Sequence, residues 1–300
     1  MKIMVFDVGG TEIKYSVMDE QMHRTNSGAV PTPQDTQAQF LDAVYRLYAP
    51  HKDEVSGIAM ALPGFVDNHT GYVSNGGALL YNTATPVGQL LAEKCSCPVI
   101  LENDGKAAAM AELANGALKD CCNAAVFIIG TGVGGGIIAN GQLVRGVHFT
   151  AGEYSFVNTN AEAWDAPDQN MACQCSTSNL LKWYRARKAL PENAPLDGRS
   201  FFAAANAGEP EALEVLRRFC HAVAVQIYNL TVLLDVEKVA IGGGISAAEA
   251  LLPAIQAELD WLFERCTVMP TVKPELVRCR YGNDANLIGA LKLFFEQNPA

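Results

Sequence analysis

One local pattern occurs twice in this chain of 300 residues and constrains its fold more than any other feature. In the first copy, the apolar run Met4–Val8 leads through Gly9-Gly10-Thr11 into an alternating segment, Ile13–Met18. Two such runs joined by a glycine-containing turn predict a β-hairpin. About 120 residues later, the apolar run Ala124–Ile129 leads into the glycine-rich stretch Gly130–Gly136 and a further strand. A supersecondary unit that recurs in this way predicts two related α/β domains.

The first of these turns has the chemistry of a phosphate site. Gly9 and Gly10 allow positive φ angles and a close approach of a ligand to the backbone, because they carry no Cβ. The hydroxyl of Thr11 and bare backbone N–H groups beside the carboxylate of Asp7 suit a nucleotide phosphate with its Mg²⁺. The alternative is an ordinary tight hairpin with a cap-forming Asp7, and the turn alone does not decide between the two.

Composition and charge limit the classes of function. Hydrophobic residues make up 49% and charged residues 18% of the chain, as in soluble globular proteins. The net charge is −10 and the chain has no run of Lys and Arg, so we expect no nucleic-acid partner. We find no secretion signal and no apolar span of roughly 18 residues, so we expect no membrane partner and a cytoplasmic protein. The nine cysteines are then expected to be reduced thiols.

The first half of the chain alternates helices and strands. We expect a first helix whose apolar face comprises Phe40, Leu41, Val44, Leu47 and Tyr48. The elements expected after it are a strand over Val55–Leu62, a hairpin over Phe65–Val73, a helix around Val87–Cys95, a strand over Pro98–Leu101 and an alanine-rich helix over Lys106–Leu118. Glu102-Asn103-Asp104 lies where a strand gives way to a helix, a place where open α/β sheets bind ligands. Asp104 suits a general base that takes a hydroxyl proton, and its alternative role is that of a helix N-cap.

The second half repeats the alternation. We expect strands over Ala124–Ile129, Ile137–Ala139, Gln142–Val144 and Lys238–Ile241, and helices over Pro210–Leu234, up to Phe263 and over Asn286–Phe295. Residues 157–200 are polar, contain prolines and give no assignment. The strand at Lys238–Ile241 ends in a further glycine-rich turn, Gly242-Gly243-Gly244.

Three glycine-rich turns therefore follow three strands. None fits the dinucleotide fingerprint, because Gly9-Gly10 opens a hairpin instead of a helix, and no Walker A sequence is present. The turns with Thr11 and Thr131 suit instead a triphosphate that is held from opposite domains, while the turn at Gly242–Gly244 leaves room for a flat adenosine. Phosphoryl transfer needs positioning, charge stabilisation and a group that orients the acceptor hydroxyl, and Asp104 suits that last role.

The chain resembles the ROK family of sugar kinases, which is named for repressors, open reading frames and kinases. The segments that carry the resemblance are, in order, Asp7–Lys14, Leu62–Asp67, Glu102–Asp104, Gly130–Gly136, Ala151–Glu153, Ile241–Ser246 and Gly282–Ala285. The resemblance implies an α/β fold with two actin/hexokinase-like (ribonuclease H-like) domains and a ligand cleft between them. We expect a smaller N-terminal domain at 1–117 with a closing helix at 287–300, and a larger C-terminal domain at 118–286.

The same resemblance implies ATP-dependent transfer to a sugar hydroxyl, usually O6 of a hexose, with Asp104 as the base. It implies that Asn103 and Glu153 bind sugar hydroxyls, that Asp7 serves Mg²⁺, and that Thr11 and Thr131 hold phosphates. Further residues expected to bind the sugar are Gly64, Gly77 and Phe156. Further residues expected to bind ATP are Gly9, Gly10, Lys14, Gly130, Gly132, Gly134, Gly243 and Gly244. Family members are commonly dimers, so we expect a homodimer.

The chain departs from the family at the family's zinc site. The family has a His three residues after the sugar-binding Glu, followed by a Cys-x-Cys-Gly-x-x-Gly-Cys-x-Glu segment. Here Phe156 stands at the His position, Cys173 and Cys175 match, Leu180 replaces the third Cys and Lys182 replaces the Glu. Two thiolates cannot complete a tetrahedral Zn²⁺ site, so we expect no zinc.

These departures also alter the sugar pocket. Phe156 in place of His removes a polar contact, and an aromatic ring at this position can stack under a second sugar ring or an aglycone. The zinc-less members that look most similar are β-glucoside kinases, which act on cellobiose-like compounds, and the segment Gly71–Ala78 resembles them too. We therefore expect a β-glucoside kinase. The alternatives are a kinase for glucose, N-acetylmannosamine or another hexose, and a sugar-binding regulator without catalysis.

Overall fold

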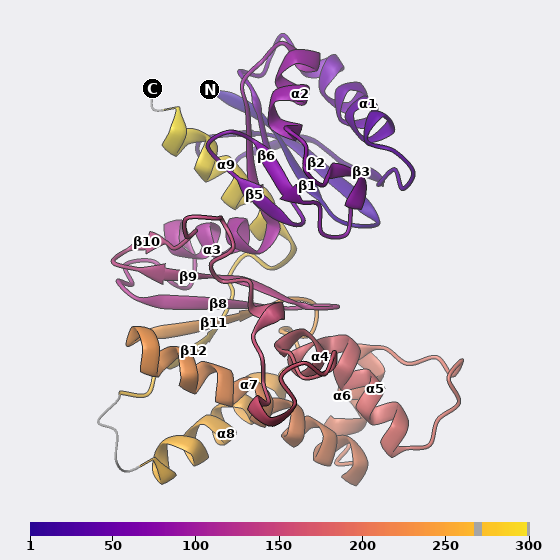
Figure 1. Ribbon diagram of the computed structural model, residues 1–300, viewed down its shortest axis with the longest axis vertical. Helices are drawn as coiled ribbons and strands as arrows, with labels where there is room; N and C mark the ends of the chain where they lie inside the picture. The colour runs from indigo at the N-terminus through magenta and orange to yellow at the C-terminus, as the bar shows by residue number, and fades with distance from the viewer. Residues whose placement is uncertain (267–271, 299–300) are drawn as a thin grey trace. The chain divides into compact units, whose positions relative to one another are not determined.

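The structure is a computed structural model that describes residues 1–266 and 272–298 (Figure 1). The chain divides into two compact units, each with its own sheet and its own hydrophobic core. Unit 1 comprises Met1–Ala114, Arg145–Ala151 and the residues from Asn283 onward, and unit 2 comprises Asn115–Val144 and Gly152–Gly282. The closing segment predicted at 287–300 has its last two residues outside the described part of the chain.

The sheet of unit 1 has the strand order β3-β2-β1-β4-β7. Its strands are β1 (Lys2–Val8), β2 (Glu12–Asp19), β3 (Arg24–Pro31), β4 (Ile58–Leu62) and β7 (Val99–Asn103). The first three strands are antiparallel neighbours, whereas β1, β4 and β7 run parallel. The predicted opening hairpin is confirmed, because Val8 pairs with Ile13 and the Gly9 N–H donates to the Glu12 carbonyl at 2.9 Å.

Helices cover both faces of this sheet. The other elements of unit 1 are α1 (Gln37–Tyr48), α2 (Val87–Cys95), α3 (Asp104–Asn115), α9 (Ala285–Gln297) and the small hairpin of β5 (Phe65–Asp67) and β6 (Tyr72–Asn75) (Figure 1). Met4 and Phe6 of β1 belong to one buried cluster with Phe40 of α1, while the alternate residues Ile3 and Val5 are equally buried. Because side chains alternate along a strand, burial of both sets requires cover on both faces.

The sheet of unit 2 has the order β10-β9-β8-β11-β12, with the same succession of antiparallel and parallel neighbours as in unit 1. Its strands are β8 (Ala124–Ile129), β9 (Val133–Ala139), β10 (Gln142–Leu143), β11 (Lys238–Gly242) and β12 (Glu275–Arg278). The prediction for β9 was wrong at its start, because Gly134–Gly136 lie in the strand instead of the turn. A Cβ on Gly135 would lie 1.8 Å from the Val126 carbonyl oxygen, so only glycine allows the two strands to pair this closely.

Unit 2 also contains α4 (Met171–Cys175), α5 (Thr177–Arg187), α6 (Gly198–Asn206), α7 (Pro210–Leu234) and α8 (Leu251–Arg265). Three of them begin in the segment 157–200 that gave no assignment. There the Ser176 hydroxyl caps α5, and Asp197 and Ser200 form a capping box on α6. Helix α7 has the predicted bounds and buries Phe219, Val223 and Ile227. None of the helices in the described part of the chain combines the length and apolar character that crossing a bilayer requires.

Candidate active site

The predicted acid and amide lie at the junction of β7 and α3 in unit 1. The Asn103 Oδ1 atom accepts a hydrogen bond from the Lys106 N–H at 3.0 Å, so Asn103 caps the first turn of α3. The Asp104 Oδ1 atom accepts from Asn103 Nδ2 at 3.1 Å and from the Gly105 N–H at 2.8 Å. The alternative role considered for Asp104 was that of the helix N-cap. Asn103 has this role instead, because its side chain accepts from the Lys106 N–H. The contacts of Asp104 instead fix the direction of its carboxylate.

Two predicted glycines adjoin this junction. The Asn103 Nδ2 atom donates to the Gly64 carbonyl at 2.9 Å. Gly64 has a φ of +101°, and a Cβ on Gly77 would lie 2.8 Å from the Gly64 nitrogen. Both turns therefore require glycine, and unit 1 brings Gly64, Gly77, Asn103 and Asp104 together.

The opening hairpin supplies a second carboxylate to unit 1. Asp7, at the end of β1, is buried, and its Oδ1 atom accepts from Asn286 Nδ2 at 2.9 Å. The Nζ atom of Lys14 lies 3.8 Å from Asp7 Oδ2. Burial raises the pKa of Asp7, and the Asn286 hydrogen bond and the Lys14 charge oppose that rise. A carboxylate of this kind fits Mg²⁺, which prefers oxygen ligands.

The turn of this hairpin lies open to solvent. Thr11 is exposed and Gly9 and Gly10 are half-buried. A Cβ on Gly10 would lie 3.1 Å from the Cβ of Ala78, so the hairpin turn adjoins the turn that contains Gly77. The predicted phosphate residues and the predicted sugar residues of unit 1 are thus linked through Ala78.

Unit 2 contains a cavity of about 720 Å³ beside its own glycine-rich turns. Its lining includes the predicted Gly130, Thr131 and Gly244, together with Thr177, Ser178, Leu181, Asp197, Gly198, Arg199, Phe202, Ile245, Ala247 and Ala248. Gly243 has a φ of +91°, and a Cβ there would lie 2.2 Å from the Ile129 carbonyl oxygen, so this glycine turn lies tightly against the end of β8. The cavity has the size and mixture of apolar and polar groups typical of small-molecule sites. Sequence reasoning missed its residues from α5 and α6, because the segment 157–200 gave no assignment.

The predicted Glu153 immediately precedes a short helical turn in unit 2, Tyr154–Phe156, and the predicted Phe156 is the last residue of that turn. The Ser155 hydroxyl accepts from the Val133 N–H at 3.2 Å and donates to the Val133 carbonyl at 3.0 Å. A Cβ on Gly132 would lie 3.2 Å from the same hydroxyl. These contacts bring the Glu153 turn against the turn that contains Gly132. Gly134 lies beyond that turn, inside β9, where it pairs with Ile128.

The residues at the family's zinc positions do not fit a zinc ion. Phe156 is 71% exposed and has no ligating atom, and Leu180 is fully buried in the core of unit 2. The Cys175 thiol is fully buried, and burial raises its pKa to about 12. The Cys173 thiol donates to the Pro167 carbonyl at 3.5 Å.

One charged pair beside Asp104 was missed by sequence reasoning. The Arg145 Nε atom donates to Glu102 Oε2 at 2.8 Å, and the Glu102 side chain is only 1% exposed. Nothing local in the sequence indicates this pair, since its members are 43 positions apart. Asn286, the partner of Asp7, was missed for the same reason.

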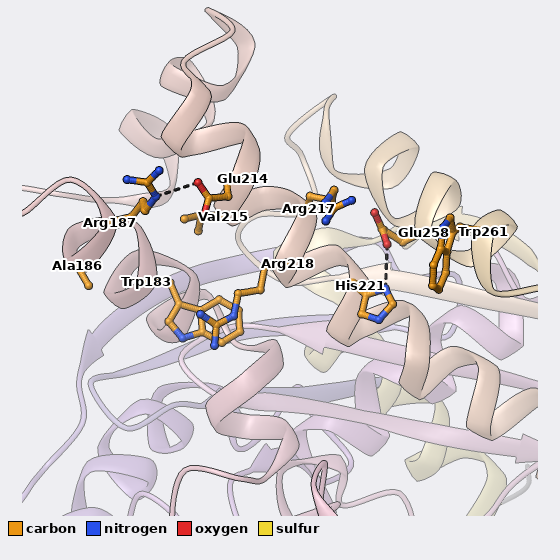
Figure 2. Close-up of a pocket in the computed structure, with 10 residues that line it drawn as sticks. All are labelled: Trp183, Ala186, Arg187, Glu214, Val215, Arg217, Arg218, His221, Glu258 and Trp261. Carbon is orange, nitrogen blue, oxygen red and sulfur yellow. Dashed lines mark hydrogen bonds and ion pairs between the residues drawn. The ribbon is translucent and has the colours of Figure 1, made fainter.

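A separate hollow of about 770 Å³ lies between α5, α7 and α8 (Figure 2). It contains the ion pair Arg187–Glu214 and a hydrogen bond between His221 Nδ1 and Glu258 Oε2, both at 2.9 Å. Arg218 lies over the ring of Trp183, with 3.8 Å from the guanidinium carbon to the ring centroid. The predicted site residues, all within the described part of the chain, do not line this hollow.

The two sheets of equal strand order, each with a hairpin turn rich in glycine, define the class of actin/hexokinase-like α/β proteins. Residues 3–297 match the ROK family, and the chain belongs to that family. It is 31% identical over 297 residues to the β-glucoside kinase of Klebsiella pneumoniae, and the aligned region covers 98% of this chain and 96% of that protein.

Two solved structures show the same fold over the whole length. A ROK family protein from Streptococcus pneumoniae in complex with sucrose is 29% identical, with a TM-score of 0.88 and 99% of both chains covered. A ROK family glucokinase from Streptomyces griseus in complex with glucose and AMPPNP is 25% identical, with a TM-score of 0.81 and coverage of 98% of this chain and 99% of that chain.

Proposed function

We propose that the protein is an ATP-dependent sugar kinase that transfers the γ-phosphoryl group to O6 of a glucosyl unit, in a β-glucoside such as cellobiose. Membership in the ROK family and full-length similarity to a β-glucoside kinase support this proposal. The observation that carries it is the oriented carboxylate of Asp104, which two N–H donors hold at the end of β7.

In the proposed reaction, Asp104 accepts the proton of the O6 hydroxyl as the bond from O6 to the γ-phosphorus forms. The bond from the γ-phosphorus to the bridging oxygen breaks, and ADP leaves with the electron pair of that bond. A general base of this kind contributes about 10²–10⁴ in rate. Asn103 and Glu153 bind sugar hydroxyls, and the backbone at Gly64 and Gly77 borders the sugar.

ATP is proposed to occupy the cavity of unit 2. The apolar side chains of Leu181, Phe202 and Ile245 suit the adenine base, and Thr131 with the backbone at Gly130 suits a phosphate. Gly132, Gly134, Gly243 and Gly244 complete the glycine-rich surroundings of the nucleotide. In unit 1, Gly9, Gly10, Thr11 and Lys14 approach the phosphates. Asp7 would hold Mg²⁺, which neutralises charge on the β- and γ-phosphates when it is bound.

The preference for a glycoside rests on Phe156. Its ring is 71% exposed, which makes it available to stack on a second sugar ring or an aglycone. The side chains at the zinc positions argue against a bound zinc ion, so we propose that the pocket works without one.

A monosaccharide kinase is the second candidate, and the similarity to a glucokinase that binds glucose and AMPPNP favours it. A catalytically silent sugar-binding regulator is the third candidate, and it conflicts with the presence of Asp104 and both glycine-rich turns. The homodimer, the cytoplasmic location, the cleft and the domain division at 117/118 and 286/287 stay predictions.

A substrate panel tests the proposal. ADP release is measured with ATP and Mg²⁺ for cellobiose, gentiobiose and arbutin on one side, and for glucose, N-acetylglucosamine and N-acetylmannosamine on the other. We expect the highest kcat/KM for a β-glucoside. A much higher kcat/KM for glucose or an amino sugar would reject the glycoside preference and retain the kinase. No ADP release with any sugar would reject the kinase itself.

A further inference from the structure

The ion pair between Arg145 and Glu102 is buried where a charge is costly. The Glu102 side chain is 1% exposed and that of Arg145 is 22% exposed, and the contact of Nε with Oε2 is 2.8 Å long. An ionised carboxylate out of water is strongly destabilised unless a cation and hydrogen bonds compensate it. Arg145 supplies that compensation, and its Nη2 atom also contacts the Met110 sulfur at 3.2 Å.

The other oxygen of the Glu102 carboxylate contacts the backbone at the end of β7, directly before the proposed base Asp104. Glu102 Oε1 accepts from the Asn103 backbone N–H at 2.9 Å. Asn103 in turn holds Asp104 Oδ1 at 3.1 Å and the Gly64 carbonyl at 2.9 Å through its side-chain amide. Glu102 is therefore a bridge between the guanidinium of Arg145 and the backbone that carries Asn103 and Asp104.

Arg145 also marks the point where the chain changes unit. Residues 145–151 belong to unit 1, whereas Val144 before them and Gly152 after them belong to unit 2. The Ala151 N–H donates to the Arg145 carbonyl at 3.2 Å, which closes this crossing segment into a loop. Its contacts within unit 1 include Arg145 with Glu102 and the ring of Phe149 with that of His69. Glu153, proposed to bind the sugar, follows the crossing segment by two residues.

We propose that Arg145 is a positioning residue, which keeps the Glu102 carboxylate in place so that it fixes Asn103 and Asp104, and which fastens the crossing segment 145–151 to unit 1. Arg145 itself does not touch substrate in this scheme. The proposal rests on the proposed function for its effect on catalysis, but its effect on the buried carboxylate is independent of any activity.

The first test compares Arg145→Met with Arg145→Lys and with Arg187→Met. Arg187 is the matched control, because its Nε atom meets Glu214 at 2.9 Å in an exposed pair, with side chains 50% and 61% exposed (Figure 2). We expect Arg145→Met to lower kcat roughly 100-fold, the size of effect that a small misplacement of a catalytic group produces. Arg145→Lys should recover part of this loss, and Arg187→Met should change kcat less than about 2-fold, as for an exposed pair.

A double variant separates positioning from general loss of structure. Glu102→Gln keeps an oxygen for the Asn103 N–H but removes the charge that needs Arg145. Arg145→Met combined with Glu102→Gln should therefore have a higher kcat than Arg145→Met alone. Equal or lower kcat in the double variant, or wild-type kinetics in Arg145→Met, would overturn the proposal.

The pH dependence provides a readout that does not need catalysis. Burial raises the pKa of Glu102, while Arg145 and, from α3, Lys106 oppose the rise. Removal of Arg145 should raise this pKa further. The protonated carboxyl needs no counter-ion, so the Tm difference between wild type and Arg145→Met should be large at neutral pH and shrink as pH falls through the pKa of Glu102. The acid limb of the kcat profile should move to higher pH in the same variant.

If the Tm difference between wild type and Arg145→Met is the same at every pH, Arg145 does not stabilise the charged form of Glu102 and the proposal fails. If the wild type releases no ADP with any sugar while the pH-dependent Tm difference is present, the proposed function fails and the buried pair stands. If ADP release is normal and the Tm difference does not depend on pH, the proposed function stands and the role of Arg145 fails.

Discussion

The two units have sheets of the same strand order but carry different chemistry at the ends of their strands. In unit 1, β1 ends with Asp7-Val8 and β7 ends with Glu102-Asn103, while Asp104 begins α3. In unit 2, β8 takes the position of β1 and ends at Ile129, directly before Gly130, while β11 takes the position of β4 and ends at Gly242, directly before Gly243. A cavity of about 720 Å³ lies beside these turns. One architecture thus presents carboxylates in one unit and glycine-rich surface in the other. In the function proposed above, unit 1 handles the proton and the metal, and unit 2 holds the nucleotide.

The largest effect is expected when the proposed base of unit 1 is neutralised, which tests whether unit 1 handles the proton. Asp104→Asn keeps the shape of the side chain but removes its capacity to accept a proton, so kcat should fall about 10²–10⁴-fold. Sugar affinity, measured by isothermal titration calorimetry, should stay within a few-fold of the wild type. The control is Asp42→Asn, the same change at an exposed carboxylate on α1, which should leave kcat unchanged. Equal losses of sugar binding and turnover would show that Asp104 has a structural role instead.

A smaller effect is expected from a methyl group in the nucleotide cavity of unit 2. A Cβ on Gly130 would have no protein atom within 4 Å, so Gly130→Ala should fold normally and meet only the ligand. We expect the KM for ATP to rise roughly 10-fold, which corresponds to a loss of about 1.4 kcal/mol in the free energy of ATP binding. The KM for sugar and the Tm serve as internal controls and should not change. A change in sugar KM with an unchanged ATP KM would reverse the assignment of the two units.

The smallest effect concerns the choice of sugar. Phe156→Ala removes the exposed ring proposed to stack on the aglycone, so the ratio of kcat/KM for arbutin to that for glucose should fall about 2- to 10-fold. Phe156→Tyr keeps a ring of the same shape and should preserve the ratio. An unchanged ratio in Phe156→Ala would mean that glycoside selectivity lies elsewhere in the pocket.

The sequence predicted the architecture well because its signals are local. The strand and turn at Met4–Thr11, the repeat at Ala124–Gly132 and the periodic face of α7 each lie within one short window, and all three were confirmed. The prediction was wrong for the glycines at 134–136, because the sequence does not distinguish a glycine in a strand from one in a turn. Only the structure shows that the Val126 backbone lies so close to Gly135 that a strand residue there must be glycine.

The parts that were not predicted depend on contacts between distant residues. Glu102 and Arg145 are separated by 43 positions and Asp7 and Asn286 by 279, and no local pattern indicates either pair. The cavity lining from α5 and α6 was missed because the polar segment 157–200 has caps such as Asp197 but little apolar periodicity. The roles assigned to the site residues stay predictions that the variants above test.

The most direct test of the central claim is identification of the product by ³¹P NMR. The protein is incubated with ATP, Mg²⁺ and cellobiose, and with ATP and Mg²⁺ alone. The account predicts that cellobiose gives ADP and, in equal amount, a phosphomonoester coupled to the methylene protons at C6 of the non-reducing glucosyl ring, and that Asp104→Asn gives almost none. If neither cellobiose nor any other sugar of the panel yields ADP and a sugar phosphate, the protein is not the kinase proposed here.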